Sequence, residues 1–282
     1  MKPRASSLLA LWLLLVCNAA AAAGESTFPD IQRILDRGTL RVAMLDREMP
    51  PLIMTGQDGK LTGSDVDLAR DLAWKMGVAV QFMRSAETAD EVVEVVARGE
   101  ADLGVSFLSS DVRRAKRVLF SQPYLEQKRR VFYNRAAFAK LQRDYPVNTI
   151  RQLLGTDAVA DLQIGVVEGS IYGPILQRDY PQLTVRPFPR LAELVNAVKE
   201  GRVSAGFHGE LRINYYMRRH PETAIYIGLD PEAPYPSDIR IAVRPDAPNL
   251  QQWVNIYLDN HVGQLDASEL IERYIGSHAG ED

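Results

Sequence analysis

The chain has 282 residues, 46% of them hydrophobic and 24% charged, and a formal net charge of −3 at pH 7. This slightly acidic balance offers no basic face to nucleic acid, so no nucleic-acid partner is expected. A single cysteine excludes an internal disulfide, and the four histidines lack paired-ligand spacing, so neither a metal nor a cofactor is expected.

The first 23 residues have the features of an export signal. Two basic residues precede an apolar run from Leu8 to Val16, and small residues follow at 19–23. The apolar run is shorter than the roughly 20 residues of a membrane-spanning helix, and no charged stop follows it. We therefore expect cleavage near residue 23 and secretion. A lipid anchor at Cys17 is the less favoured alternative, because the bulky Val16 precedes it.

Strand and helix patterns alternate along the first half of the mature chain. Apolar residues recur at helical spacing over 63–77, with acidic residues near the start of this segment and Gly77 at its end. A second helix is predicted over 90–98. Short apolar strands are predicted at 39–44, 78–83 and 101–107. This alternation predicts an α/β fold with parallel strand pairing.

The second half repeats this scheme weakly. Residues 92–107 and 194–209 each contain an apolar helix pattern, a charged residue with a glycine, and a short strand with a glycine inside it. An apolar strand within 162–169 opens the second half as 39–44 opens the first. Any two strand–helix units share some of these features, so coincidence remains the alternative. Two similar lobes is the favoured interpretation.

Four stretches together resemble the bacterial extracellular solute-binding proteins of family 3. They are GKLTGSDVDLARDLAWKMG, ARGEADLGVSFLSSDVRRAKRVLFSQPYL, GVVEGS and IRIAVRPD. The resemblance implies a two-lobed α/β fold of the periplasmic binding protein type II kind. Its first lobe would be discontinuous, comprising 24–132 and 240–282, and its second lobe would comprise 133–239. Two crossover strands, near 127–133 and 238–243, would form the hinge.

The resemblance also implies a function. Such a protein would be a monomeric periplasmic receptor that closes on a small carboxylate-bearing solute, an amino acid or a related organic acid, and delivers it to the membrane permease of an ABC importer. A sensor or accessory protein that docks a membrane or periplasmic partner is one alternative. A dehydratase-like enzyme on the same fold is another, although no paired carboxylates or Ser-His-Asp spacing supports catalysis. A non-enzyme is therefore favoured.

In this family an arginine that follows a strand binds the ligand carboxylate, helped by hydroxyl and main-chain N–H groups before it. That position falls on Arg114, with Ser106, Phe107 and Ser109 as the preceding site residues. A planar guanidinium suits a carboxylate because two parallel hydrogen bonds fix orientation as well as charge. The alternative is that Arg114, like Arg113, lies on the solvated face of a basic helix.

Other family positions fall in three loops. Asp46 can receive a cationic group, and Met49 stands where the family often has an aromatic ring. Ser170 and Ile171 stand at a helix start, where two hydroxyl residues are usual and where main-chain N–H groups attract anions. A solvated turn is the alternative for the loop that contains Asp46.

The family aspartate that binds the ligand ammonium is absent. Gly209 occupies its place, between His208 and Glu210. Either neighbour is a candidate ligand contact, although a lone histidine is more often structural and a carboxylate is favoured at any helix start. A buried ammonium without a partner loses several kcal/mol, so we expect the best ligand to be a carboxylate without an α-ammonium group.

Overall fold

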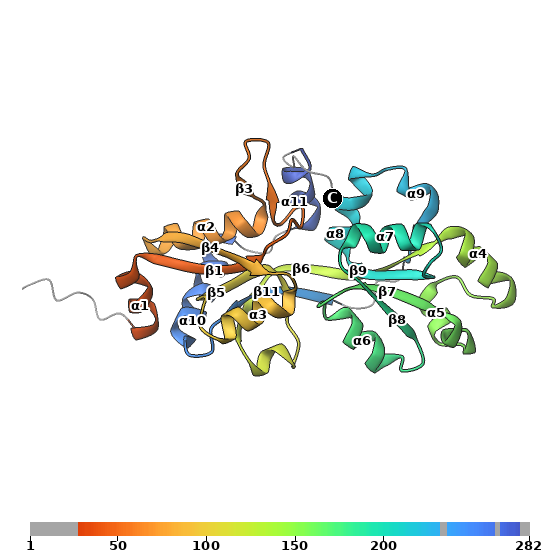
Figure 1. Ribbon diagram of the computed structural model, residues 1–282, viewed down its shortest axis with the longest axis horizontal. Helices are drawn as coiled ribbons and strands as arrows, with labels where there is room; N and C mark the ends of the chain where they lie inside the picture. The colour runs from red at the N-terminus through yellow and green to blue at the C-terminus, as the bar shows by residue number, and fades with distance from the viewer. Residues whose placement is uncertain (1–27, 232–235, 263–265, 277–282) are drawn as a thin grey trace, which may run out of the picture.

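The computed structural model describes residues 28–231, 236–262 and 266–276, so the expected export signal lies outside the described residues. The described chain folds into two α/β lobes, which are joined through the long strand β6 (Leu119–Asn134) and strand β11 (Pro236–Val243) (Figure 1). In these ranges no helix has the length and apolar composition of a membrane span. The two-lobed α/β fold expected from the sequence is confirmed.

One sheet of nine strands runs through both lobes of the described chain, in the order β4-β1-β5-β11-β6-β9-β7-β8, with β10 also paired to β6. In the first lobe, β1 (Thr39–Leu45) pairs in parallel with β4 (Ala79–Ala86) and β5 (Leu103–Ser109). Helices α2 (Ser64–Met76) and α3 (Ala89–Ala97) lie on opposite faces of these strands (Figure 1), as right-handed crossovers to the two sides of β1 require.

The end of the chain returns to the first lobe through α10 (Pro248–Tyr257) and α11 (Ala267–Tyr274). The Tyr257 hydroxyl donates to Asp71 on α2 at 2.6 Å, and the Tyr274 hydroxyl donates to Asp67 on the same helix at 2.7 Å. These hydrogen bonds attach the C-terminal helices to a helix near the start of the chain. The first lobe is therefore discontinuous in sequence.

The second lobe has the same local plan. Strand β7 (Gln163–Val167) pairs in parallel with β8 (Thr184–Phe188) and with β9 (Ala205–Gly209), just as β1 pairs with its two neighbours. The unit α7 (Leu191–Lys199) plus β9 matches the unit α3 plus β5, down to the left-handed glycines that follow the two helices, Gly99 (φ 72°) and Gly201 (φ 73°). The two copies of the weak sequence repeat thus form equivalent helix–strand units, one in each lobe.

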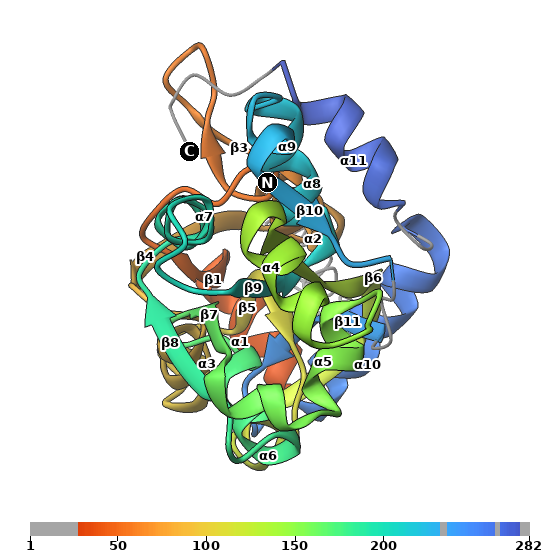
Figure 2. The ribbon, with the colours of Figure 1, turned by 90° about the vertical axis from the view of Figure 1, so that its right-hand side faces the viewer.

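The remaining elements complete the two lobes. Helices α4 and α5 lie at the outer end of the second lobe, nearest the viewer in Figure 2. The basic helix expected after β5 is only the 3-10 turn η1, because β6 begins three residues later. The bounds are α1 (Pro29–Arg37), β2 (Met54–Thr55), β3 (Leu61–Thr62), η1 (Arg114–Lys116), α4 (Arg135–Asp144), α5 (Ile150–Leu154), η2 (Asp157–Asp161), α6 (Tyr172–Asp179), α8 (Glu210–Arg219), α9 (Thr223–Tyr226), β10 (Ile227–Leu229) and the π-helical turn η3 (Leu258–Val262).

Separate buried cores support the two lobes. The first lobe has one apolar cluster, and the second lobe has two. Leu211 and Tyr215 of α8 belong to the first-lobe cluster, so this helix of the second lobe packs across the interface. The loops that follow β1, β7, β8 and β9 supply lining residues to the space between the lobes. Ligands of open α/β sheets bind at such carboxyl ends of strands.

Candidate functional site

Two adjoining cavities lie between the lobes. The wide cavity, of about 870 Å³, is lined by the loops after β1 and β8 and by α8. The narrow cavity, of about 60 Å³, lies between the end of β5 and the turn after β7. Arg47, Met49, Val167 and His208 line both cavities. The two cavities are therefore parts of one interlobe cleft.

A buried carboxylate shapes the β5 side of the narrow cavity. Phe107 has a left-handed backbone (φ 52°), and its N–H donates to Asp65 Oδ2 at 2.7 Å. The Tyr124 hydroxyl donates to Asp65 Oδ1 at 2.9 Å. Burial raises the pKa of the Asp65 carboxyl to about 7, against the opposing effect of these two hydrogen bonds. Asp65 thus holds Phe107 in a backbone conformation that is uncommon for residues other than glycine.

The two serines of β5 already take part in protein hydrogen bonds. Ser106 Oγ accepts from the Leu45 N–H at 3.2 Å, which ties β5 to β1. Ser109 Oγ lies 3.2 Å from Ser237 Oγ on β11. Both side chains are buried and line the narrow cavity. They support the wall of the cavity through contacts between strands.

Arg114 is almost fully buried, and each nitrogen of its guanidinium donates a hydrogen bond to a protein acceptor. Its Nε donates to Asp90 Oδ1 at 2.9 Å, and its Nη1 donates to the Ser109 carbonyl at 2.8 Å. Its Nη2 donates to the Gly169 carbonyl of the second lobe at 3.0 Å. Burial acts to raise the pKa of Asp90, but the hydrogen bonds and charges of Arg113 and Arg114 outweigh it and hold that pKa below its ordinary value. Arg114 thus links the two lobes.

The turn after β7 approaches the first lobe too closely for any side chain at Gly169. This glycine is left-handed (φ 66°), and a Cβ there would lie 2.5 Å from the Thr88 Cβ. Ser170 Oγ donates to the Val167 carbonyl at 2.5 Å, and Ile171 is buried beside it. The lobes are therefore in direct contact at the narrow cavity.

His208 is a buried, neutral imidazole at the boundary of the two cavities. Burial and the positive charge of Arg212 lower the pKa of His208 to about 3. The Gly209 N–H donates to His208 Nδ1 at 2.8 Å, so the ring proton resides on Nε2. Next to it, a Cβ at Gly209 would lie 2.7 Å from the side-chain nitrogen of Gln127. The Gln127 amide fills the space that an aspartate side chain would need.

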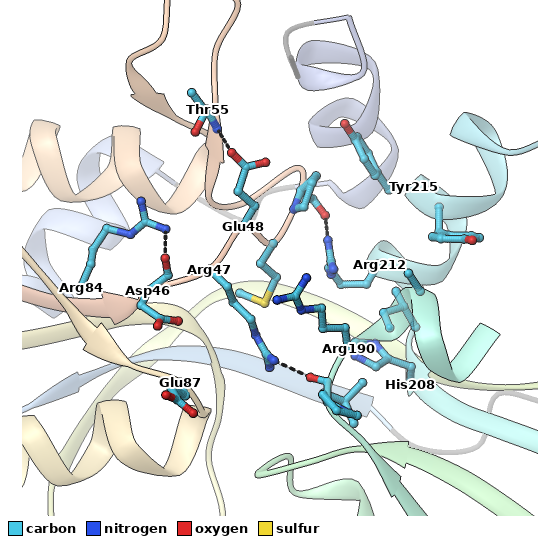
Figure 3. Close-up of a pocket in the computed structure, with 17 residues that line it drawn as sticks. Asp46, Arg47, Glu48, Thr55, Arg84, Glu87, Arg190, His208, Arg212 and Tyr215 are labelled. Atoms are coloured by element: carbon cyan, nitrogen blue, oxygen red, sulfur yellow. Dashed lines mark hydrogen bonds between the residues drawn. The ribbon is translucent and has the colours of Figure 1, made fainter. Parts of the chain in front are cut away.

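Side chains of both charges line the wide cavity. Figure 3 shows Arg47, Arg190 and Arg212 gathered in the middle of the cavity, with His208 nearby. Asp46 and Glu87 lie together on the first-lobe side, below Arg84. Arg84 donates to the carbonyls of Leu45 and Asp46, at 3.0 and 2.7 Å, and Glu48 Oε1 accepts from the Thr55 N–H at 2.8 Å.

The three arginines in the middle form what we call the arginine corner: Arg47, Arg190 and Arg212. Arg47 donates to the Pro189 carbonyl and Arg212 to the Pro50 carbonyl, so each reaches the opposite lobe. Burial and the nearby charge of Arg190 lower the pKa of Arg47, while Asp46, Glu168 and Glu193 act in the opposite direction. The like charges of Arg47 and Arg190 therefore repel each other.

The structure gathers most of the residues expected at the site. Asp46, Met49 and His208 line the wide cavity. Met49, Ser106, Phe107, Ser109, Arg114, Ser170, Ile171 and His208 line the narrow one. Glu210 is not among the lining residues, and its carboxylate pairs with Arg130 on β6 at 3.1 Å. The ligand contacts of these residues stay predictions, and Glu210 is the one that the fold directs elsewhere.

Sequence reasoning missed the arginine corner. Arg47 lies within the DREMPP loop that contains Asp46 and Met49, yet no role was assigned to it. Arg190 follows β8 directly, and Arg212 lies in the first turn of α8 after β9. Each of the three follows the carboxyl end of a parallel strand. An arginine after the carboxyl end of a predicted parallel strand could have indicated a ligand contact, because ligands bind at this edge of such sheets.

Comparisons with known proteins agree with this architecture. A family model described as "Bacterial extracellular solute-binding proteins, family 3" matches residues 40–277. An "Arginine-binding periplasmic protein" of Mannheimia haemolytica is 25% identical over 66% of this chain and 70% of its own length. A "Membrane-bound lytic murein transglycosylase F" of Maricaulis maris is 27% identical over 82% of this chain, which spans only 48% of that relative.

Among solved structures, an ancestral amino acid-binding protein, described as a precursor of cyclohexadienyl dehydratase, has a TM-score of 0.69. It is 24% identical, and the match covers 87% of this chain and 99% of that one. At this level of identity the likeness establishes the fold and leaves the ligand open.

Proposed function

The chain belongs to the bacterial extracellular solute-binding proteins of family 3, and from this premise we propose that it is a periplasmic receptor for a small carboxylate-bearing solute. The lobes close on the solute, and the closed form delivers it to the permease of an ABC importer. The match to an arginine-binding periplasmic protein supports solute binding as the general role. The chain acts as a monomer, because one cleft between its own two lobes suffices.

The observation that carries the proposal is the interlobe cleft itself. Its wide cavity measures about 870 Å³, within the range of small-molecule sites. Both lobes supply arginines to it, so an anionic solute would contact both lobes at once. A ligand that bridges two lobes favours their closed arrangement, because its binding energy is gained only there.

Arg114 is the proposed partner of the solute carboxylate. In the closed arrangement its Nη2 donates to the Gly169 carbonyl of the second lobe. When the lobes part, this hydrogen bond breaks and its Nη2 donor is released for a carboxylate, whereas Nη1 still donates to the Ser109 carbonyl of the same lobe. A carboxylate would replace a neutral carbonyl with a charged acceptor, and charge-assisted hydrogen bonds are roughly twice as strong.

An accessory or sensor role is the second candidate. The match to a membrane-bound transglycosylase covers less than half of that protein, so domains similar to this one occur within larger proteins. A dehydratase-like activity is less favoured, because Ser106 and Ser109 hydrogen-bond to other strands and His208 Nδ1 accepts the Gly209 N–H. Recovery of an incubated solute chemically unchanged distinguishes a receptor from an enzyme.

A thermal-shift screen of amino acids, dipeptides, keto acids and aromatic acids tests the proposal. A solute that binds only the folded protein raises the melting temperature in proportion to the logarithm of its concentration. We expect at least one carboxylate to do so, and its chemical recovery to be complete. A screen in which no carboxylate stabilises the protein, whereas a membrane-protein partner does, would favour the accessory role.

A further inference from the structure

The wide cavity holds a second group of arginines, separate from the proposed carboxylate partner Arg114. Arg114 lies in the narrow cavity, whereas the arginine corner of Arg47, Arg190 and Arg212 lies in the wide one. Because Arg47 lines both cavities, a single solute is able to reach from Arg114 to the arginine corner. A solute with one carboxylate, bound at Arg114, would place no anion beside Arg47 and Arg190.

Arg190 and Arg47 retain unused hydrogen-bonding capacity. Arg190 is exposed in the cleft, and among the described residues no hydrogen bond or ion pair engages its guanidinium. Arg47 gives one Nη to the Pro189 carbonyl, and it makes no carboxylate ion pair within the described ranges. A guanidinium has five N–H donors, so both side chains have donors available to a ligand anion.

The acidic side chains near the cavity act on Arg47 without forming an ion pair with it among the described residues. Asp46, Glu168 and Glu193 act to raise the pKa of Arg47, but burial and the charge of Arg190 outweigh them and lower it. Glu48 accepts the Thr55 N–H at 2.8 Å (Figure 3). His208 stays uncharged, and its remaining ring proton on Nε2 makes it a hydrogen-bond donor beside the corner. An oxyanion thus finds charged and neutral donors together.

We propose that the solute carries two anionic groups, one for Arg114 and a second one that is bound in the arginine corner by Arg47 and Arg190 with Arg212. This inference rests on the proposed function and specifies its ligand as a dicarboxylate or a carboxylate with another oxyanion. Binding of the second group would draw the loops after β1 and β8 together, since Arg47 belongs to the first lobe and Arg190 to the second. The arginine corner then determines specificity, and Arg114 determines orientation.

Calorimetric titration of matched acids tests the inference. The probes are pairs that differ only in a second carboxylate: succinate and butyrate, glutarate and pentanoate, glutamate and norvaline. We expect the member of the best pair that has two carboxylates to bind at least about tenfold more tightly. Arg190→Gln should reduce that ratio to about threefold or less, because it removes one charge of the corner without disturbing any hydrogen bond among the described residues.

The matched control is Arg143→Gln. Arg143 is also exposed, also belongs to the second lobe and also lacks a partner among the described residues, but it lies on α4 at the outer end of that lobe. This variant should keep the full ratio. Equal affinity for both members of every pair would overturn the inference and leave the proposed function standing. Failure of these six acids and of every carboxylate in the thermal-shift screen to bind would overturn both.

Discussion

The narrow and wide cavities adjoin, but they differ in how far protein groups already engage their arginines. In the narrow cavity Arg114 is buried with three protein acceptors, and Ser106 and Ser109 bridge strands. In the wide cavity Arg190 is exposed, and no hydrogen bond or ion pair among the described residues engages it. A ligand must therefore displace a protein contact to bind Arg114, whereas Arg190 is available without such a displacement.

This difference separates two tasks of a hinged receptor. The hydrogen bond from Arg114 to the Gly169 carbonyl stabilises the closed arrangement before any ligand binds, and a ligand carboxylate must replace it. Groups that have no partner until a ligand arrives supply the differential affinity that makes closure depend on that ligand. The predictions below disturb the narrow cavity and ask whether binding responds.

The largest effect is expected from Arg114→Ala. Loss of the guanidinium removes the proposed carboxylate partner, and we expect ligand affinity to fall by about 2–5 kcal/mol, the typical cost of truncating one member of a buried charge pair. The neighbouring Arg113 has a half-exposed side chain and pairs with the same Asp90, so Arg113→Ala should change affinity little. Calorimetry on both variants measures the difference. Equal losses would mean that the carboxylate binds elsewhere.

Gly169→Ala tests the close approach of the lobes. A Cβ at this position would lie 2.5 Å from Thr88 of the first lobe, so closure would require the two loops to move apart. We expect affinity to fall by about 1–3 kcal/mol, the usual cost of overpacking. Gly201→Ala is the matched control, because that glycine is equally left-handed (φ 73°) and its added Cβ would meet nothing within 4 Å. The same loss in both variants would attribute the effect to backbone strain alone.

Asp65 should make stability depend on pH. Burial raises the pKa of its carboxyl from 3.8 to about 7, so the folded protein holds a proton that the unfolded chain releases. Between these values the free energy of unfolding should fall by about 1.4 kcal/mol for each unit that the pH rises, and above about pH 7 this contribution levels off. Urea unfolding of the native protein and of Asp65→Asn measures it. A slope that persists in Asp65→Asn would assign the effect to another group.

The smallest effect concerns Gly209→Asp, which restores the aspartate typical of the family. The new side chain must displace the Gln127 amide, whose oxygen accepts the Leu211 N–H at 3.2 Å. We expect a loss of about 1 kcal/mol in the free energy of unfolding, the net value of one hydrogen bond. Gln127→Ala combined with Gly209→Asp should bind α-amino acids better than Gly209→Asp alone. Identical affinity in both would show that Gln127 does not block the position.

Local patterns were sufficient for the elements and for most of the narrow cavity. The helical spacing over 63–77 and its final glycine predicted α2, which runs over Ser64–Met76 with Gly77 left-handed (φ 75°). The family resemblance then placed Ser106 and Arg114 at the cleft, because their order along β5 and the following turn is local. Such features depend on a few consecutive residues, and so they are visible in sequence.

Long-range features were not predictable in the same way. The pairing of Asp90 with Arg114 joins the start of α3 to η1, and the Gly169 carbonyl reaches Arg114 from the other lobe. The Gln127 amide beside Gly209 comes from a crossover strand far away in sequence. No spacing along the chain encodes these contacts, since they exist only once the two lobes have been joined through β6 and β11.

The most direct test of the account compares the best carboxylate found in the screen with its own primary amide. The two differ in charge but hardly in size, so calorimetric titration isolates the contribution of the anionic group. The account predicts that the amide binds at least about tenfold more weakly, since a hydrogen bond to a charged group contributes about 1.5–3 kcal/mol. Equal affinity for acid and amide would contradict the claim that arginines in the interlobe cleft select a carboxylate.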